Sequence, residues 1–219
     1  MTTAIKEKPV IFSSEMVRAI LDNRKTQTRR VIKPQPDCFW TRYVDGQSYG
    51  LPAKDSRLIK CPFGEVGDEM WVRETWMPYT EEDDDSVDSL IRYRADQSFL
   101  PATGELAAKF FEVDQWKNFS NPERWRPSIH MPRWASRIQL RIVNVRVERV
   151  QDMSATDAVA EGLQWKSPTF FVYGIPESVN GNPVESFRGL WDSINGDRDG
   201  CDWESNPFCW VVEFEKVKP

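Results

Sequence analysis

A lysine and a threonine, Lys25 and Thr28, stand close together in the segment 23–30, and residues of these types could carry out acyl transfer. A threonine hydroxyl is a poor nucleophile at neutral pH, but an amine whose pKa has been lowered by burial can take its proton. Lys25 is therefore a candidate base and Thr28 a candidate nucleophile. The alternative is a solvated helix end, in which Lys25 and the neighbouring Arg29 and Arg30 simply face water.

A second candidate surface interleaves arginines with tryptophans. It begins at Arg124-Trp125-Arg126 and continues through His130, Arg133, Trp134 and Arg137. Guanidinium groups hold phosphates and indole rings stack on bases, so this composition suits a nucleic acid. The alternative is that the tryptophans are core and the arginines lie over them in cation–π contact. A single histidine such as His130 is more often structural than catalytic.

A third candidate lies on the expected strand that follows Gly67-Asp68. Arg73 and Glu74 point to opposite faces of this strand, so only one of them can line a cleft. Trp76 shares the side of Glu74. A buried Glu74 would need a cation such as Arg29 or Arg30 as its partner.

The remaining composition limits the classes of function. The chain has 219 residues, a formal charge of −5 and four cysteines without CxxC spacing, so a disulfide framework is not expected. A zinc site from Cys61, Cys201 and His130 has no support from spacing. No apolar run reaches the length of a membrane span, and the N-terminus lacks a signal peptide's apolar core. We therefore expect a cytoplasmic chain with no metal, no cofactor and no membrane partner.

The elements that must position these residues follow from hydrophobic periodicity. A strand at 9–12 leads into a helix capped by Ser13 or Ser14, which Asn23 ends in the left-handed conformation. The alternation over 137–150 changes phase near 142–143, which predicts a β-bulge or a sharp bend. Ser154 and Asp157 fit a capping box for a helix that Gly162 ends. The spacing of apolar residues over 187–194 predicts an amphipathic helix, and 208–214 a closing strand. Residues 81–85 are an acidic run, interpreted as a loop tip.

Four segments of this chain together resemble the ASCH domain family, in particular its phage and prophage branch. The first is 20–30, Ile-Leu-Asp-Asn-Arg-Lys-Thr-Gln-Thr-Arg-Arg, which is similar to the family's G-x-K-x-x-T/E-x-R signature with asparagine in place of glycine. The others are 67–74, Gly-Asp-Glu-Met-Trp-Val-Arg-Glu; 130–137, His-Met-Pro-Arg-Trp-Ala-Ser-Arg; and 157–162, Asp-Ala-Val-Ala-Glu-Gly.

The resemblance implies an α+β fold: a PUA-like curved β-barrel with short flanking helices. We expect one domain over 1–219, with insertions near 34–66, 78–127 and 164–183. The resemblance also implies a catalytic set of Lys25, Thr28 and Glu161. The residues expected to bind nucleic acid or substrate are Arg24, Arg29, Arg30, Arg73, Glu74, Trp76, His130, Arg133, Trp134 and Arg137.

Three functions stay open at this stage. The first is a hydrolase, either an amidohydrolase on a modified nucleoside of the N4-acetylcytidine type or a ribonuclease. Replacing Lys25 by alanine would then abolish activity with little change in Tm. The second is a non-catalytic module that binds RNA or other nucleic acid in a phage or prophage. The third is a protein that binds and inhibits a host factor. The oligomeric state is left open.

Overall fold

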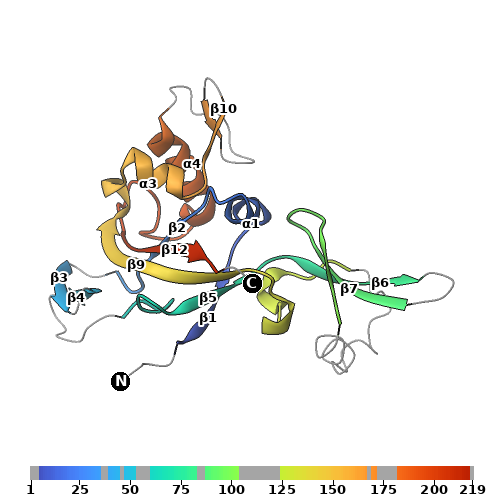
Figure 1. Ribbon diagram of the computed structural model, residues 1–219. Helices are drawn as coiled ribbons and strands as arrows, with labels where there is room; N and C mark the ends of the chain where they lie inside the picture. The colour runs from blue at the N-terminus through green and yellow to red at the C-terminus, as the bar shows by residue number, and fades with distance from the viewer. Residues whose placement is uncertain are drawn as a thin grey trace. The chain divides into compact units, whose positions relative to one another are not determined.

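The computed structural model of this chain is a mixed α+β structure (Figure 1). It describes residues 5–35, 39–44, 47–52, 60–82, 87–103, 124–166, 169–171 and 182–217. The contacts between residues divide the chain into two compact units. Unit 1 comprises 1–8, 19–70 and 140–219, and unit 2 comprises 9–18 and 71–139.

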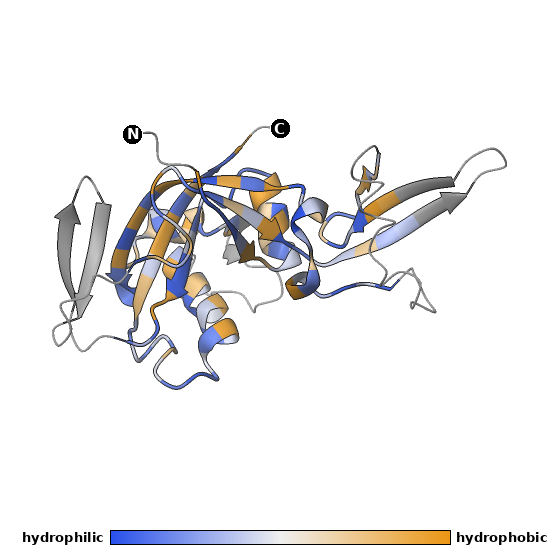
Figure 2. Ribbon diagram, turned by 90° about the horizontal axis from the view of Figure 1, so that it is seen from below, coloured by the Kyte–Doolittle hydropathy of each residue, from blue (hydrophilic) through white to orange (hydrophobic). Residues whose placement is uncertain are grey.

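A five-stranded sheet has the strand order β1-β5-β9-β12-β2. Its strands are β1 (Glu7–Ile11), β2 (Gln27–Val31), β5 (Glu69–Arg73), β9 (Gln139–Arg149) and β12 (Phe208–Lys216). Strand β12 pairs antiparallel with both β9 and β2. Apolar and polar residues alternate along the strands, as the two faces of a sheet require (Figure 2).

The predicted β-bulge is confirmed. Glu213 pairs with Asn144, whereas the next residue, Phe214, pairs with Ile142, so Val143 is the extra residue on β9. One additional residue shifts the side-chain alternation by one position, which explains the change of phase in the sequence.

The structure contains the three predicted helices and confirms the caps that were predicted for the first two. In α1 (Ser14–Leu21) the Ser13 hydroxyl accepts a hydrogen bond from the backbone N–H of Met16 at 3.3 Å. In α3 (Ala155–Ala160) Ser154 and Asp157 form the expected capping box. The amphipathic helix is α4 (Pro183–Asn195), which begins after the cap Asn182. Unit 1 also holds the short elements β3 (Phe39–Val44), β4 (Gln47–Pro52), η4 (Val150–Asp152), β10 (Gln164–Lys166) and β11 (Thr169–Phe171).

The core of unit 1 lies between the sheet and its helices. Helices α3 and α4 contact each other, and they lie together beside β2 and β12 (Figure 1). Their apolar residues join a cluster made of Val150, Met153, Ala158, Leu163, Phe187, Trp191, Trp203 and Cys209. The helices therefore bury one face of the β9-β12-β2 sheet, the face that carries the candidate site.

Unit 2 contains a three-stranded antiparallel sheet with the order β6-β7-β8. Its elements are β6 (Trp76–Glu82), β7 (Val87–Tyr93), β8 (Phe99–Pro101) and the 3-10 helices η2 (Ser128–His130) and η3 (Arg133–Ala135). Its core consists of Trp76, Ile91, Tyr93, Met131 and Ala135, with Leu100 and Trp134 packed against it.

The five-stranded sheet is open as far as the described residues show it, because β1 and β2 are its two edges. The α+β class is confirmed, whereas a closed barrel is not seen in this part of the chain. The single-domain organisation stays a prediction. The expected insertions are described in part: they hold all or part of β3, β4, β6, β7, β8, β10 and β11. Within them, 36–38, 45–46, 53–59, 83–86, 104–123, 167–168 and 172–181 are not among the described residues. Of the acidic run interpreted as a loop tip, 81–82 end β6, and 83–85 lie outside the described residues. Of the helices described, none is long and apolar enough to cross a membrane.

Candidate functional site

Lys25 and Glu161 form a buried ion pair in unit 1. The Nζ atom of Lys25 lies 2.8 Å from Oε2 of Glu161 and 2.9 Å from its backbone oxygen. Their side chains are only 0% and 4% exposed. Two of the three residues expected to be catalytic are thus in direct contact.

Two backbone turns bring these residues together. Asn23 ends α1 with a φ of 57°, the left-handed conformation expected from the sequence, and the chain turns directly into Lys25. Gly162 follows Glu161 with a φ of 102°. A Cβ atom on Gly162 would lie 3.0 Å from the Cβ of Ala19 and 3.1 Å from that of Lys25. Only glycine lets the end of α3 approach α1 and Lys25 this closely.

Arg29 extends the ion pair into a network beneath α3. Its side chain is 0% exposed, and its Nη1 atom lies 3.4 Å from Oε1 of Glu161. Its Nη2 atom lies 3.0 Å from Oε2 of Glu148 and 3.5 Å from Oδ2 of Asp157. Arg146 binds Asp157 at 2.9 Å and also pairs with Glu148 and Glu213. We call this set the charge network: Lys25, Arg29, Arg146, Glu148, Asp157, Glu161 and Glu213.

The charge network balances most of its own charge, with three cations and four carboxylates. Burying ions costs several kcal/mol each unless partners and hydrogen bonds replace water. Arg24 is also engaged, because it donates to the backbone oxygen of Gly162 at 2.9 Å and pairs with Asp22. Arg30 is half-buried, and the charge of Glu161 opposes the lowering of its pKa by burial. The basic segment is thus largely internal, contrary to the interpretation as a solvated helix end.

Burial sets the pKa of Lys25 below its ordinary value. Removal from water disfavours the charged amine, and the nearby Arg29 and Arg30 add to this effect, while Glu161 opposes it. In Asp157, hydrogen bonds and nearby charges together have a larger effect on the pKa than burial does. Burial would raise its pKa, but hydrogen bonds from Ser154 and the charges of Arg29 and Arg146 outweigh burial and hold the pKa at about 2.

Thr28 does not join Lys25 and Glu161. It lies in β2 opposite Val212, between Gln27 and Arg29 in sequence. Because neighbouring strand residues point to opposite faces, Thr28 faces away from the side on which Arg29 meets α3. Among the described residues, the hydrogen bonds of Lys25 and Glu161 do not include Thr28. Its role as nucleophile stays a prediction.

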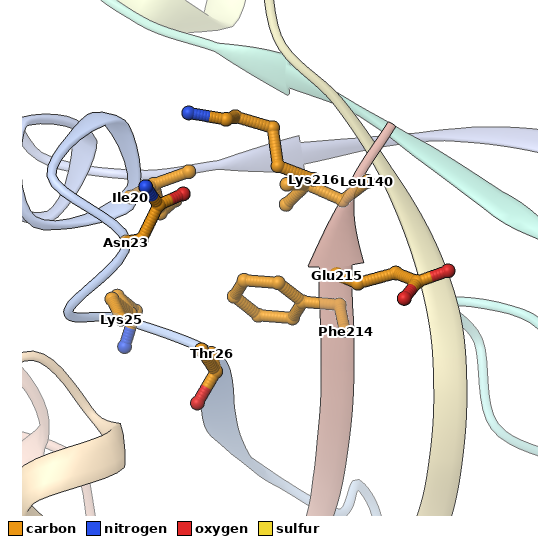
Figure 3. A pocket seen from close by; sticks show the side chains of 8 residues that line it. All are labelled: Ile20, Asn23, Lys25, Thr26, Leu140, Phe214, Glu215 and Lys216. Carbon is orange, nitrogen blue, oxygen red and sulfur yellow. The ribbon is translucent and has the colours of Figure 1, made fainter. Parts of the chain in front are cut away.

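A pocket of about 550 Å³ opens beside Lys25 in unit 1 (Figure 3). The ring of Phe214 points from β12 toward the segment of Asn23 and Lys25, and Thr26 stands next to it (Figure 3). We call this the Phe214 pocket; it is lined by Ile20, Asn23, Lys25, Thr26, Leu140, Phe214, Glu215 and Lys216. Its volume is within the range of small-molecule sites.

A second pocket of about 290 Å³ shares Thr26 and Phe214 with the first. We call it the Thr156 pocket; it is lined by Thr26, Gln27, Val143, Thr156, Asp157, Ala160, Glu213 and Phe214. Thr26 is exposed, and its backbone is held between α3 and β12 by hydrogen bonds to Ala160 and Phe214 at 2.9 and 2.8 Å. Thr26 therefore borders both pockets.

The expected binding residues of unit 2 form clusters of their own. Glu74 is buried, as expected, but its partner is Arg137 and not Arg29 or Arg30: Nε and Nη2 of Arg137 donate to its two oxygens at 2.9 and 3.0 Å. Burial raises the pKa of Glu74, and Arg137 opposes this. Arg137 also binds Asp96 at 2.9 Å, so its guanidinium is fully occupied.

The tryptophans of unit 2 belong mainly to the core. Trp76 is buried and meets Trp134 edge to face with 5.9 Å between ring centroids. Arg73 lies over the ring of Trp71 at 4.7 Å, and Arg133 lies over the same ring at 5.9 Å. His130 is exposed. These contacts match the cation–π alternative for the arginine–tryptophan segment.

Four members of the charge network were not among the predicted site residues: Arg146, Glu148, Asp157 and Glu213. Arg146 and Glu148 occupy the polar positions of β9, which a period-2 pattern assigns to solvent, although α3 covers that face. Asp157 was interpreted only as a helix cap. The signal that could have found them is the density of opposite charges on one face of adjacent strands. The described residues hold no group of three or more metal-ligating side chains.

Comparison of the chain with protein-family models, with curated proteins and with solved structures gave no match.

Proposed function

We propose that this chain is an ASCH-type hydrolase that cleaves an amide on a modified nucleoside of the N4-acetylcytidine kind. The single observation that carries the proposal is the buried Lys25–Glu161 pair, with 2.8 Å between Nζ and Oε2, of which Lys25 lines the Phe214 pocket. The proposal includes a PUA-like barrel for the whole chain and a cytoplasmic location. The curvature that the bulge at Val143 introduces into β9 supports the barrel.

The pair is suited to proton transfer. Burial disfavours the ammonium form of Lys25, and Nζ lies within hydrogen-bond distance of Oε2 of Glu161, so the amine has a proton acceptor in direct contact. In the proposed reaction, water adds to the carbonyl carbon of the amide and passes a proton to the pair. The C–N bond then breaks, the pair returns a proton to the leaving amine, and acetate and the free amine are released.

The Phe214 pocket suits a flat, partly polar ligand. Ile20, Leu140 and Phe214 supply buried apolar surface, while Asn23 and Thr26 are exposed polar side chains at its rim. An aromatic ring beside amide and hydroxyl groups can hold a nucleobase by stacking and hydrogen bonds. We assign the attack to water because Thr28 faces away from the pair.

The test is release of acetate and cytidine from N4-acetylcytidine by the purified chain, followed by chromatography. We expect turnover by the wild type and a loss of about 100-fold or more in kcat for Glu161→Gln, the usual effect of removing a general acid–base group. Glu148→Gln is the matched control, since Glu148 pairs with Arg29 in the same network but contacts neither Lys25 nor the Phe214 pocket. Equal losses in both variants would show that the pair is structural.

A second candidate is a module that binds the same ligand without turnover. It is favoured by the full occupation of Glu161: Oε2 and the backbone oxygen accept from Lys25, and Oε1 from Arg29. A carboxylate whose two oxygens both accept hydrogen bonds is held in place. It can accept a proton from water or substrate only if one of these hydrogen bonds breaks. Calorimetric binding of N4-acetylcytidine without acetate release would decide for this candidate.

A further inference from the structure

One face of the β6-β7-β8 sheet in unit 2 carries arginines and aromatic rings side by side. Arg92 lies over the ring of Phe99 at 5.4 Å and over the ring of Trp125 at 5.9 Å. Arg94 lies over the same Trp125 ring, also at 5.9 Å. Phe99 in turn contacts Tyr79 with 5.4 Å between ring centroids. We call these five residues the arginine–aromatic face.

The strand register places these residues together. Arg92 and Arg94 alternate with Ile91, Tyr93 and Ala95, which are buried, so the arginines point to the outer face. Phe99 pairs directly with Arg92 across β7 and β8. The position of Trp125 is fixed by its neighbour Arg126, whose backbone forms an antiparallel β-bridge with Trp76 at the start of β6. The core of unit 2 thus fixes the outer face from beneath.

The arginine–aromatic face is partly exposed to solvent, and one of its arginine nitrogen atoms has no hydrogen-bond partner. Phe99 is 45% exposed, and Arg94 is exposed. The Nε atom of Arg92 is buried without a hydrogen-bond partner. Among the side chains that the structure describes, no carboxylate pairs with Arg92 or Arg94. Arg137 of the same unit differs, because Glu74 and Asp96 neutralise it.

We propose that the arginine–aromatic face binds single-stranded nucleic acid. Aromatic side chains stack on unpaired bases, and guanidinium groups beside them hold the phosphates and stack as well. A duplex keeps its bases stacked internally and cannot use the rings. The proposal is independent of the amide hydrolysis proposed above, since it uses no residue of the Lys25 site or its pockets.

The acidic run 81–85 begins in the last two residues of β6 and continues in the sequence toward β7, and negative charge of this kind opposes a polyanion. On charge alone we expect the occupant to be a short stretch of single strand. The acidic run also allows an experiment to distinguish two classes of partner. Removing negative charge from it is expected to strengthen the binding of a nucleic acid and to weaken the binding of a basic peptide.

The test is fluorescence anisotropy of labelled oligouridylate and oligodeoxythymidylate, with a duplex of equal length, at low salt. We expect saturable binding of the single strands and weaker binding of the duplex. Phe99→Leu keeps apolar bulk but removes the π face, and we expect affinity to fall about tenfold. The double variant R92A/R94A is expected to lower the salt slope of log K by up to about two. Asp83→Asn and Asp84→Asn together are expected to raise affinity.

The matched control is R141A/R188A, which removes two arginines of similar exposure, 44% and 43% of their side chains, from unit 1. It is expected to bind the single strands as the wild type does, and circular dichroism verifies the fold of each variant. No binding by the wild type, full binding by Phe99→Leu, or equal losses in the control would each overturn the proposal. Competition by polyglutamate but not by single strands would assign the face to an acidic peptide.

Discussion

The Nζ atom of Lys25 donates to two oxygens of one residue, the carboxylate Oε2 of Glu161 at 2.8 Å and its backbone oxygen at 2.9 Å. The contact ties the chain before β2 to the C-terminal end of α3. Because the second bond uses the backbone, it holds α3 in place whatever the charge of the carboxylate. Chemistry and stability are therefore coupled at this pair.

Replacing Lys25 by methionine is expected to destabilise the protein by about 3 kcal/mol. This is the usual cost of leaving one member of a buried ion pair without its partner. This replaces the sequence-based expectation of an unchanged Tm, because the side chain is completely buried. Urea unfolding measures the change. The double variant K25M/E161Q should lose less than the two single variants added together. Strict additivity would show that the two residues do not interact.

Gly162→Ala is expected to lower the free energy of unfolding by roughly 2 kcal/mol, because alanine is strained at a φ of 102° and its Cβ would crowd Lys25. Thermal unfolding followed by circular dichroism measures it. Gly67→Ala is the control, since its φ is also positive at 93° but nothing lies within 4 Å of an added Cβ. The excess loss in Gly162→Ala is the cost of the close approach. Equal losses of unfolding free energy in the two variants would show that the whole effect comes from the strained backbone conformation and not from the contact with Lys25.

The variants Thr28→Val and Thr26→Val test the roles of two threonine hydroxyls separately. Thr28 faces away from the Lys25–Glu161 pair, so kcat for N4-acetylcytidine should stay within about twofold of the wild type. Thr26 borders both pockets, so its variant should raise KM by about fivefold, the worth of one hydrogen bond. Steady-state kinetics measure both. A loss of kcat in Thr28→Val would restore Thr28 as the nucleophile.

Asp157 predicts a dependence of stability on pH. Its pKa is lowered from the usual 3.8 to about 2, so the folded state favours the carboxylate and this contribution is complete above pH 3.8. It is lost as pH falls through the window down to about 2. The difference in unfolding free energy between wild type and Asp157→Asn should therefore shrink across that window. Asp22→Asn, at a largely exposed carboxylate, is the control. A difference that is constant with pH would contradict the assignment.

Local sequence was sufficient for the elements around the site. Ser154 and Asp157 predicted the start of α3, Asn23 the left-handed end of α1, and the change of phase near Val143 the bulge in β9. Each of these signals depends on residues within a few positions of one another, so no distant contact is needed to interpret them.

The pairing of charges could not be predicted in the same way. Glu74 was expected to meet Arg29 or Arg30 and instead binds Arg137, which lies 63 positions away in the sequence. Many cations could neutralise a buried carboxylate, and the sequence does not rank them. The β-pairing register and the adjacent 3-10 helices decide which one comes within reach.

The sequence by itself therefore determined the three helices, the strands β1, β5, β9 and β12 and the caps of α1 and α3, and it placed Lys25 at the exit of α1. It did not determine that α3 would cover the polar positions of β9, because a period-2 pattern distinguishes two faces but not what lies over each. Only the tertiary structure decided that Lys25 and Glu161 are buried together and that Arg29 and Arg146 join them in the charge network. The same alternation that brings Arg29 to α3 turns Thr28 to the opposite face, so the strand register separates these neighbours.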